Sequence, residues 1–409
     1  MASDTISSLV IVQPATRTQF RPDIEGLRAI AVGVVVAFHG FGVPFLGGFV
    51  GVDVFFVISG FLITSLLLRE GERTGGVSIL AFYARRVRRI LPASALVVGL
   101  TVVAAYCFLG FITGNDVAIA AKWTAIFAAN IHFGLIGTDY LGSQLPPSPL
   151  QHMWSLGVEE QFYLVWPAVV MIVILVVKAR RYRCGLAVVL CVVIAASFAW
   201  SIVQTQDNAT WAYFSPLTRA CELGIGALIS VSAPWIGRVR SRWLSEGLAV
   251  VGLAGIFAAA LLLNSSARFP GYSVALPVIS SGLVIWAGCA NERTQVARLL
   301  SVKPMVWVGA RSYSLYLWHW PILIIAKQYL MTDLTLVQRS ALVFAAVVLS
   351  AVSYSLIENP FRNSKKLASR NWLSLTVGIG LVSATVVLSQ AFIATHGGSW
   401  NVLEPSSFQ

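Results

Sequence analysis

Charged residues are scarce in this chain of 409 residues: only 11% are Asp, Glu, Lys or Arg, whereas 57% are hydrophobic. Soluble globular domains carry about a quarter charged residues, so this composition excludes an ordinary water-soluble fold. Cysteine is scarce too. The five cysteines stand in or beside apolar runs at unrelated spacings. That placement favours small core residues over a disulfide framework or a metal site.

Several sequence patterns are absent. The five histidines show neither HExxH nor another paired ligand spacing, and no Walker A or GxGxxG motif precedes a helix. We therefore expect no metal centre and no nucleotide hydrolysis. The N-terminal "SSLVIV" is too short for the apolar core of a signal peptide, so the first long apolar run is predicted to be retained. There is no internal repeat of fixed period.

Long apolar runs dominate the rest of the chain, whose mean hydropathy is +0.78. Runs of about 20 residues match the hydrocarbon thickness of a bilayer, so we predict an all-α integral membrane protein, a polytopic helical bundle. The net charge is +12. Lys and Arg collect in a few short loops, which favours the positive-inside pattern over nucleic-acid binding. The candidate spans are 27–45, 49–68, 91–112, 118–136, 155–177, 185–203, 211–232, 246–263, 272–290, 305–327, 336–357 and 372–394.

Loop charges predict the topology. If all twelve candidates crossed the membrane, the basic loop "KARRYRCG" would lie outside. Treating 118–136 as interfacial or re-entrant restores the alternation, and this segment, with Lys122, Asn130 and His132, is the least apolar. We predict about 11 spans with the N-terminus in the cytoplasm and the C-terminus outside. The predicted parts are a cytoplasmic tail (1–20), a membrane domain (21–360), and a cytoplasmic loop, additional span and short external tail (361–409).

Polar residues inside spans mark functional sites or structural ion pairs. Arg28 and His39 are eleven residues apart, which on a helix is about 16.5 Å of rise and about 20° of rotation, so they share one face. The turn near "PFLGG" brings Asp53 back toward the depth of His39. A carboxylate beside an imidazole suits a general base. The alternative is a hydrogen bond that only ties two helices together.

Four arginines in "FYARRVRRILP" lie at the predicted cytoplasmic surface. Arg85 and Arg88 are three residues apart, as are Arg86 and Arg89, so each pair lies on neighbouring faces of a helix. Either pair could hold a polyphosphate. A topogenic or lipid-headgroup patch is the alternative. Arg219 and Glu222, spaced i,i+3, are predicted to form a buried ion pair. Further polar residues inside or at the ends of the predicted spans are Glu159, Glu160, Tyr316, His319 and Glu358.

Five ordered motifs carry a family resemblance: "RPDIEGLRAIAVGVVVAFH", "GFVGVDVFFVISGFLIT", "FYARRVRRILPA", "HMWSLGVEEQFYLVWP" and "SYSLYLWHWP". From about Arg21 to about Pro360 the chain resembles the acyltransferase-3 family of membrane O-acyltransferases. The resemblance implies a multi-pass protein of the inner (cytoplasmic) membrane. It also implies transfer of an acyl group, usually acetyl, from cytoplasmic acyl-CoA to hydroxyls of an extracytoplasmic glycan, a lipid-linked saccharide or a related cell-envelope acceptor.

The same resemblance implies roles for individual residues. The family's basic-residue–ten–histidine signature falls on Arg28 and His39, with His39 the expected catalytic residue. Its FFxxSG motif falls on 55–60. Its RxxR motif falls on Arg85–Arg88 or Arg86–Arg89, and the sequence does not choose between these registers. The resemblance favours CoA-phosphate binding by this cluster.

Many members of the family carry an extracytoplasmic esterase-like SGNH domain after an additional span. Here a candidate for that span occurs at 372–394, and the sequence ends soon after it. The expectation is either a standalone form or a truncation of a longer protein. In a standalone form, a separate extracytoplasmic esterase-like protein is a candidate partner.

These observations define the hypothesis of an acyl-CoA-dependent O-acyltransferase without a metal. In it His39, oriented by Asp53, deprotonates the acceptor hydroxyl, with a transient acyl-His39 as the variant mechanism. Arg28 contacts the donor or stabilises an oxyanion, and the other intramembrane polar residues line the path or the acceptor pocket. One rival is a proton-coupled transporter or flippase, in which His39, Asp53 and His319 would relay protons. A non-catalytic membrane scaffold is a third reading.

Overall fold

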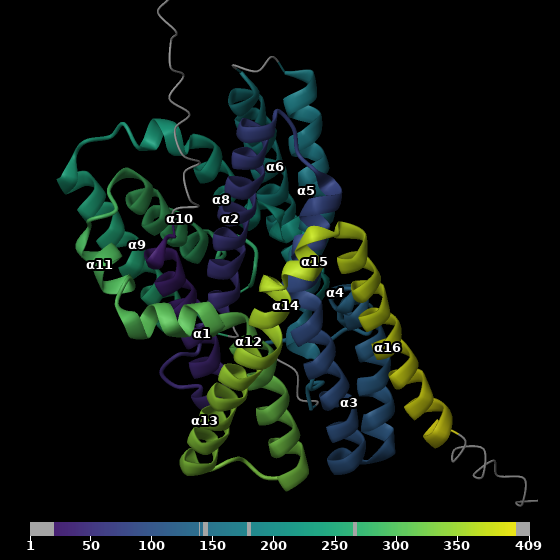
Figure 1. Ribbon diagram of the computed structural model, residues 1–409. Coiled ribbons are helices and arrows are strands. Elements are labelled where there is room, and N and C mark those ends of the chain that lie inside the picture. Colours follow the sequence, from purple (N-terminus) through teal and green to yellow (C-terminus); the bar gives the residue numbers. More distant parts are fainter. Residues whose placement is uncertain (1–19, 139, 142–145, 178–180, 265–267, 398–409) are drawn as a thin grey trace, which may run out of the picture.

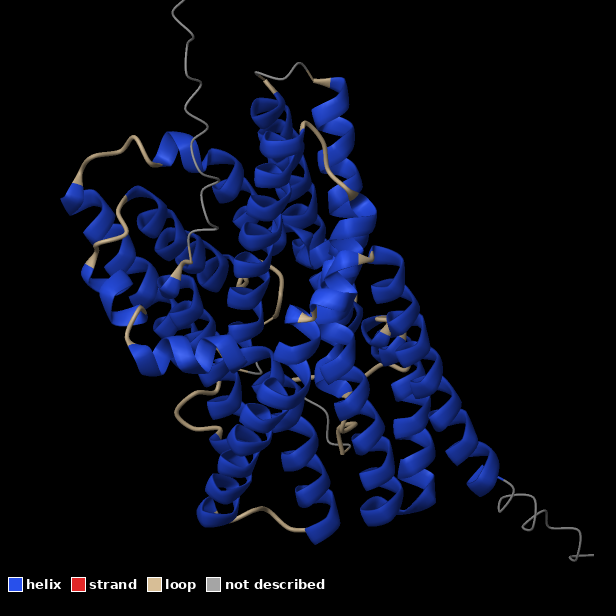
Figure 2. Ribbon diagram, in the orientation of Figure 1, coloured by secondary structure: helices blue, strands red, loops and turns tan. Residues whose placement is uncertain are grey.

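The computed structural model describes residues 20–138, 140–141, 146–177, 181–264 and 268–397. The predicted N-terminal tail, apart from its last residue, and the part of the predicted external tail beyond residue 397 lie outside these ranges. Within the described ranges the chain is helical, without a strand (Figure 2). The predicted all-helical class is therefore confirmed.

The long helices of the bundle coincide with the predicted apolar runs. They are α1 (Pro22–Phe41), α2 (Gly51–Thr74), α3 (Ile79–Ala125), α5 (Trp154–Val176), α6 (Tyr182–Asp207), α8 (Pro216–Ile236), α9 (Arg242–Leu262), α10 (Ala275–Ala290), α12 (Lys303–Leu330), α13 (Leu336–Ser353) and α16 (Asn371–Gly397). Short helices join them: η1 (Gly48–Val50), α4 (Ala129–Leu135), η2 (Gln151–Met153), α7 (Ala209–Phe214), α11 (Gln295–Leu300), the π-helical turn η3 (Tyr354–Glu358), α14 (Asn359–Asn363) and α15 (Lys365–Ser369).

The helices α1 and α2 are the most enclosed of the apolar long helices. The helix α1 packs along α12, and α2 packs along α8, which α6 covers from the other side. At the periphery α9 pairs with α10, α13 with α12, and α16 with α3 (Figure 1). Helices that carry the Arg28/His39 signature and the FFxxSG motif thus occupy the interior of the bundle.

Small residues allow α2 and α8 to approach closely. A Cβ atom added to Gly60 would stand 1.9 Å from the backbone oxygen of Leu223, and one added to Gly226 would stand 1.9 Å from that of Val57. Neither position accepts a side chain without separating the two helices. This reciprocal contact is a common way of packing helices inside a membrane.

The helix α3 is a hairpin that reverses at Gly110. Gly110 has φ 81° and ψ 175°, a conformation that glycine adopts at little cost. The Tyr106 hydroxyl donates a hydrogen bond to Asn115 Oδ1 at 2.5 Å. A straight helix would raise residue 114 about 12 Å above residue 106, yet the two are in contact. The predicted interfacial or re-entrant segment 118–136 covers the end of the returning arm and α4.

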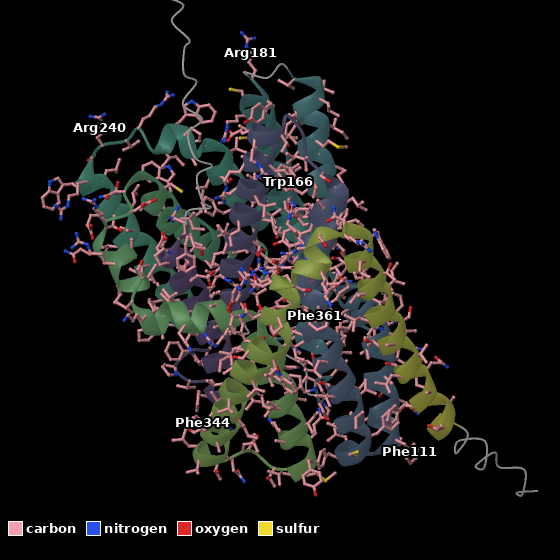
Figure 3. The ribbon with its side chains drawn as sticks, viewed as in Figure 1. Phe111, Trp166, Arg181, Arg240, Phe344 and Phe361 are labelled. Atoms are coloured by element: carbon pink, nitrogen blue, oxygen red, sulfur yellow. The ribbon has the colours of Figure 1, made fainter. Side chains whose placement is uncertain are left out.

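Eight described helices are long and apolar enough to span a membrane by themselves. The helix α10 is shorter, with 16 residues, while α8 and α12 are long enough but less apolar. The protein is thus a polytopic membrane bundle with eight candidate spans by these criteria. Arg181 and Arg240 lie at one end of the bundle, and Phe111 and Phe344 at the opposite end (Figure 3).

Candidate active site

Three parts of the chain meet around His39, which lies in the last turn of α1. The middle of α12 contributes His319, and the connection between α4 and α5 contributes Tyr140 and, in η2, His152. The helix α12 also holds this connection in place. The Trp320 indole donates to the Ser148 carbonyl at 2.9 Å, and the Gln328 amide donates to the Pro147 carbonyl at 2.8 Å.

A chain of hydrogen bonds fixes the tautomers of two histidines. His319 Nδ1 lies 2.8 Å from the Tyr316 carbonyl oxygen and 3.2 Å from that of Leu315. Both groups only accept, so Nδ1 carries the proton and His319 Nε2 is an acceptor. His39 Nδ1 lies 3.0 Å from His319 Nε2 and must therefore be its donor. The network thus assigns a lone pair to His39 Nε2.

That lone pair faces a hydroxyl group. The Tyr140 hydroxyl lies 3.0 Å from His39 Nε2 and donates to it. Tyr140 is held by stacking on Tyr213, with ring centroids 4.7 Å apart. The Trp320 ring lies 4.4 Å from the His39 ring, centroid to centroid. His39 therefore has the geometry of a neutral general base, with an O–H group already at hydrogen-bond distance.

The predicted pairing of His39 with Asp53 is wrong. Asp53 Oδ1 accepts a hydrogen bond of 2.8 Å from Arg219 Nη1, which also donates to Glu222 Oε1 at 2.9 Å. All three side chains are almost fully buried. The close α2–α8 contact brings the guanidinium to Asp53, and a buried carboxylate is more stable beside a cation than beside a neutral imidazole. The predicted Arg219–Glu222 pair is confirmed.

A cavity lies between α1, α2, α3, α5 and α12. Its lining is partly polar and partly apolar. Three cations, Arg28, Arg86 and Arg89, contribute to it, together with Ser59 and Glu159. The apolar lining comes from Phe55, Phe56, Ile58, Leu62, Ile63, Ile90 and Leu156 among others. The cavity combines several cations with an apolar wall.

Only one of the two RxxR registers faces this cavity. Arg86 and Arg89 line it, whereas Arg85 and Arg88 point elsewhere. Arg85 Nη2 pairs with Glu70 Oε2 at 2.5 Å. Arg88 Nη1 donates to Ser374 Oγ at 2.9 Å, which ties α3 to α16.

Arg86 and Arg89 differ in their partners. Arg86 forms an ion pair with Glu160 and lies 4.1 Å from the centroid of the Tyr163 ring. Arg89 makes no hydrogen bond or ion pair with any residue that the structure describes. A cation that lines a cavity without a protein partner is available to an anionic ligand.

Arg28 and Glu159 line the same cavity, and Glu358 does not. Arg28 Nη1 pairs with Glu25 Oε2 at 3.0 Å. Glu159 Oε1 accepts from Ser59 Oγ at 2.7 Å and from the Tyr163 hydroxyl at 2.6 Å. Glu358, in the π-helical turn η3, accepts from Ser314 Oγ at 2.7 Å. Ser59, which belongs to the FFxxSG motif, thus takes part in the polar lining.

A pair of hydroxyls separates the cavity from the histidines. The Tyr316 and Ser155 hydroxyls lie 2.7 Å apart, and both contribute to the cavity wall. The Tyr316 hydroxyl also donates to the His152 carbonyl at 2.8 Å. The Tyr316 ring lies 5.5 Å from the His319 ring, centroid to centroid. The cavity therefore ends one side chain away from the His39–His319 pair.

Two residues of this site are absent from the sequence prediction. Tyr140 lies outside the helices, in a segment without a periodic pattern, and no sequence signal places it beside His39. His152 stands in the motif "HMWSLGVEEQFYLVWP", yet its position before the helix gives no partner. Across the described ranges, no group of three or more His, Cys, Asp and Glu side chains is arranged to hold a metal ion.

Comparison with known proteins places this site in a family. Residues 21–355 match the model of the acyltransferase-3 family, described as an acyltransferase domain. The peptidoglycan O-acetyltransferase OatA of Listeria monocytogenes is 32% identical over 403 residues, covering 94% of this chain and 64% of the relative. The O-acetyltransferase OatA of Staphylococcus aureus is 31% identical over 395 residues, covering 92% and 64%.

A third relative is the putative peptidoglycan O-acetyltransferase YrhL of Bacillus subtilis, 32% identical over 359 residues, covering 84% of this chain and 55% of the relative. The chain thus spans 55–64% of the length of these curated relatives. No solved structure matches the chain. The chain belongs to the acyltransferase-3 family of membrane proteins, and the family expected from the five motifs is confirmed.

Proposed function

We propose that this protein is a membrane O-acetyltransferase that moves an acetyl group from cytoplasmic acetyl-CoA to a hydroxyl of an extracytoplasmic glycan. The observation that carries the proposal is the assigned lone pair of His39 Nε2, which faces a hydroxyl group at 3.0 Å. Peptidoglycan is the first acceptor to test, because two relatives are named for it. The donor-side cavity supplies the second support.

The donor binds in the cavity lined by Arg28, Arg86 and Arg89. The diphosphate of CoA contacts these guanidinium groups, because arginine forks match phosphate oxygens in geometry and charge. Arg89 makes the strongest contribution, since it forms no hydrogen bond or close ion pair with a described residue. The pantetheine arm extends along the apolar wall toward Tyr316, beside Ser59 and Glu159. Arg28 lies about 16.5 Å from His39 along α1, so it acts on the donor's phosphates.

The acceptor hydroxyl occupies the place now taken by the Tyr140 hydroxyl. His39 Nε2 removes its proton while the oxygen attacks the thioester carbonyl carbon. The carbonyl re-forms as the carbon–sulfur bond breaks. His39 Nε2 then gives the proton that it took from the acceptor to the CoA sulfur, which leaves as the thiol. His319 keeps His39 in the reactive tautomer through the bond between His39 Nδ1 and His319 Nε2. Tyr316 must move aside for the thioester to reach His39.

The proposed topology has about 11 spans, with the N-terminus in the cytoplasm and the C-terminus outside. It adds α8, α10 and α12 to the eight apolar helices, because each packs between helices that span. Basic residues collect at the end of the bundle that carries Arg181 and Arg240 (Figure 3). In this orientation acetyl-CoA enters from the arginine-lined side, and His39 lies nearer the opposite face.

The test uses purified protein in detergent, so that both faces are accessible. Radiolabelled acetyl-CoA is incubated with soluble, de-O-acetylated peptidoglycan fragments, and base-labile label on the fragments is counted. His39→Gln should lower this transfer by about 10²- to 10⁴-fold, the usual contribution of a general base. His132→Gln, a change in a half-buried histidine of α4 outside the site, is the matched control.

Undiminished transfer by His39→Gln would refute the mechanism. A transporter gives a different result: proteoliposomes would take up protons together with a saccharide, and label would stay on CoA. The same preparations therefore separate the two functions.

A further inference from the structure

His152 is a buried histidine whose ring is not satisfied. It is 0% exposed, and neither Nδ1 nor Nε2 makes a hydrogen bond in the part of the chain that the structure describes. The ring interacts with the carbonyl of Leu317, which lacks a helical N–H donor because Pro321 stands four residues later, but neither nitrogen reaches hydrogen-bond geometry with it. A neutral imidazole has a single N–H, and in His152 this N–H is left without a bonded acceptor among the described residues. Buried polar groups without partners are rare and call for an explanation.

The position of His152 supplies one. Its ring lies 5.8 Å from the His319 ring and 5.4 Å from the Tyr316 ring, centroid to centroid. Ser155, three residues later, lines the cavity. The backbone carbonyl of His152 accepts a hydrogen bond from the Tyr316 hydroxyl. His152 therefore stands where the cavity would meet the His39–His319 pair if Tyr316 turned away.

Other residues near the junction already have partners. The Tyr316 hydroxyl donates to the His152 carbonyl at 2.8 Å and accepts from the Ser155 hydroxyl at 2.7 Å, which itself lies 3.4 Å from that carbonyl. His319 uses Nδ1 on backbone carbonyls and Nε2 on His39. Of the three imidazoles in this cluster, only His152 keeps an unused nitrogen.

We propose that His152 is a further catalytic residue, whose ring N–H donates a hydrogen bond to the carbonyl oxygen of the acyl thioester. The inference rests on the proposed acyltransferase function. When the acceptor oxygen attacks the carbonyl carbon, the carbonyl electron pair moves onto its oxygen. The His152 N–H stabilises that negative charge, and the pair returns as the carbon–sulfur bond breaks. The proton taken by His39 leaves on the CoA sulfur, so His152 neither gains nor loses one.

A preorganised donor of this kind explains why the ring is left without a partner. A donor aimed at the transition-state oxygen must be free of protein acceptors before the substrate arrives. The arrangement lowers stability, because the N–H gives up its bond to water on burial. A histidine kept only for packing would gain from replacement by an apolar side chain of similar size.

The first experiment compares His152→Leu and His152→Gln with the wild type. Leucine removes the donor, and glutamine retains an N–H at a similar distance from the backbone. Transfer by His152→Leu should fall by about 10²- to 10³-fold in kcat, as when an oxyanion donor is removed, with the KM for acetyl-CoA almost unchanged. His152→Gln should recover part of the loss. The unfolding temperature of His152→Leu should not fall, since no hydrogen bond is lost.

A second measurement does not depend on the acceptor. The carbonyl stretch of bound acetyl-CoA, labelled with ¹³C at the carbonyl carbon, is recorded by infrared difference spectroscopy. In the wild type and in the control His132→Leu it should lie at lower wavenumber than in His152→Leu, because a hydrogen bond weakens the carbonyl bond.

Two results would overturn the inference. One is acetyl transfer by His152→Leu at a rate within a few-fold of the wild-type rate. The other is a carbonyl band at the same wavenumber in the wild type and in His152→Leu. Failure of the proposed function looks different. A wild type that transfers nothing to any acceptor, yet shows the shifted band, supports the His152 contact while refuting the O-acetyltransferase activity.

Discussion

Replacing Arg89 tests how the donor is recognised. Arg89 lines the cavity and forms no hydrogen bond or close ion pair among the described residues, so Arg89→Gln removes a cation without breaking such a bond. A hydrogen bond to a charged group is worth about 1.5–3 kcal/mol. At 1.36 kcal/mol per factor of ten, losing one phosphate contact should raise the KM for acetyl-CoA about 10- to 150-fold. The unfolding temperature should stay close to that of the wild type.

The matched control is Arg85→Gln, four residues earlier on the same helix. Arg85 is bound to Glu70 and its side chain is 37% exposed, so removing this ion pair should cost at most about 1 kcal/mol of stability. The KM for acetyl-CoA should not change.

The assay measures transfer from two donors, acetyl-CoA and acetyl-pantetheine, which lacks the phosphates. Arg89→Gln should lose activity with acetyl-CoA and keep the wild-type activity with acetyl-pantetheine. A higher KM in Arg85→Gln together with an unchanged KM in Arg89→Gln would refute the register assigned from the cavity. An equal loss with both donors would show that Arg89 does not act through phosphate.

Two further predictions concern stability and topology. Arg219→Met should lower the free energy of unfolding by about 3–5 kcal/mol, because it leaves the carboxylates of Asp53 and Glu222 buried without a cation; adding Asp53→Leu and Glu222→Leu should recover most of the loss in thermal unfolding. A reporter active only outside the cell should work when inserted after Asp333 and fail after Arg240, and the opposite pattern would reverse the proposed topology.

Helix positions and faces could be predicted from the sequence, because apolar runs and the helical period depend on local chemistry. Each long helix lies on a predicted apolar run, and Arg28 lines the arginine-lined cavity from the helix that carries His39. The five ordered motifs were sufficient to predict the family.

Contacts between helices could not be predicted in the same way. Two residues at equal distance from a turn need not face each other, because rotation about each helix axis depends on packing against third helices. Asp53 illustrates this: the glycine contact between α2 and α8 turns it toward Arg219. The partner of His39 comes instead from α12, 280 residues away.

The register of the arginine motif could not be predicted from the sequence for a related reason. Arg85–Arg88 and Arg86–Arg89 have the same spacing and charge, and adjacent residues differ by about 100° in direction around the helix. Only the position of α3 against α5, α12 and α16 decides which pair faces the cavity. Tyr140 belongs to an irregular segment, where no period relates sequence to direction.

The end of the cavity at the Tyr316 and Ser155 hydroxyls bears on how the proposed reaction depends on the membrane potential. In the proposed orientation, the Tyr316 and Ser155 hydroxyls separate a cytoplasmic compartment from an outer one. Moving one elementary charge through the whole membrane potential involves about 2.3 kcal/mol per 100 mV. The proposed reaction would exchange an acetyl group on sulfur for a proton from the acceptor oxygen, and both reactants and both products would keep their charges. The exchange moves no net charge, so acetyl transfer proceeds at the same cost in an energised or a depolarised cell.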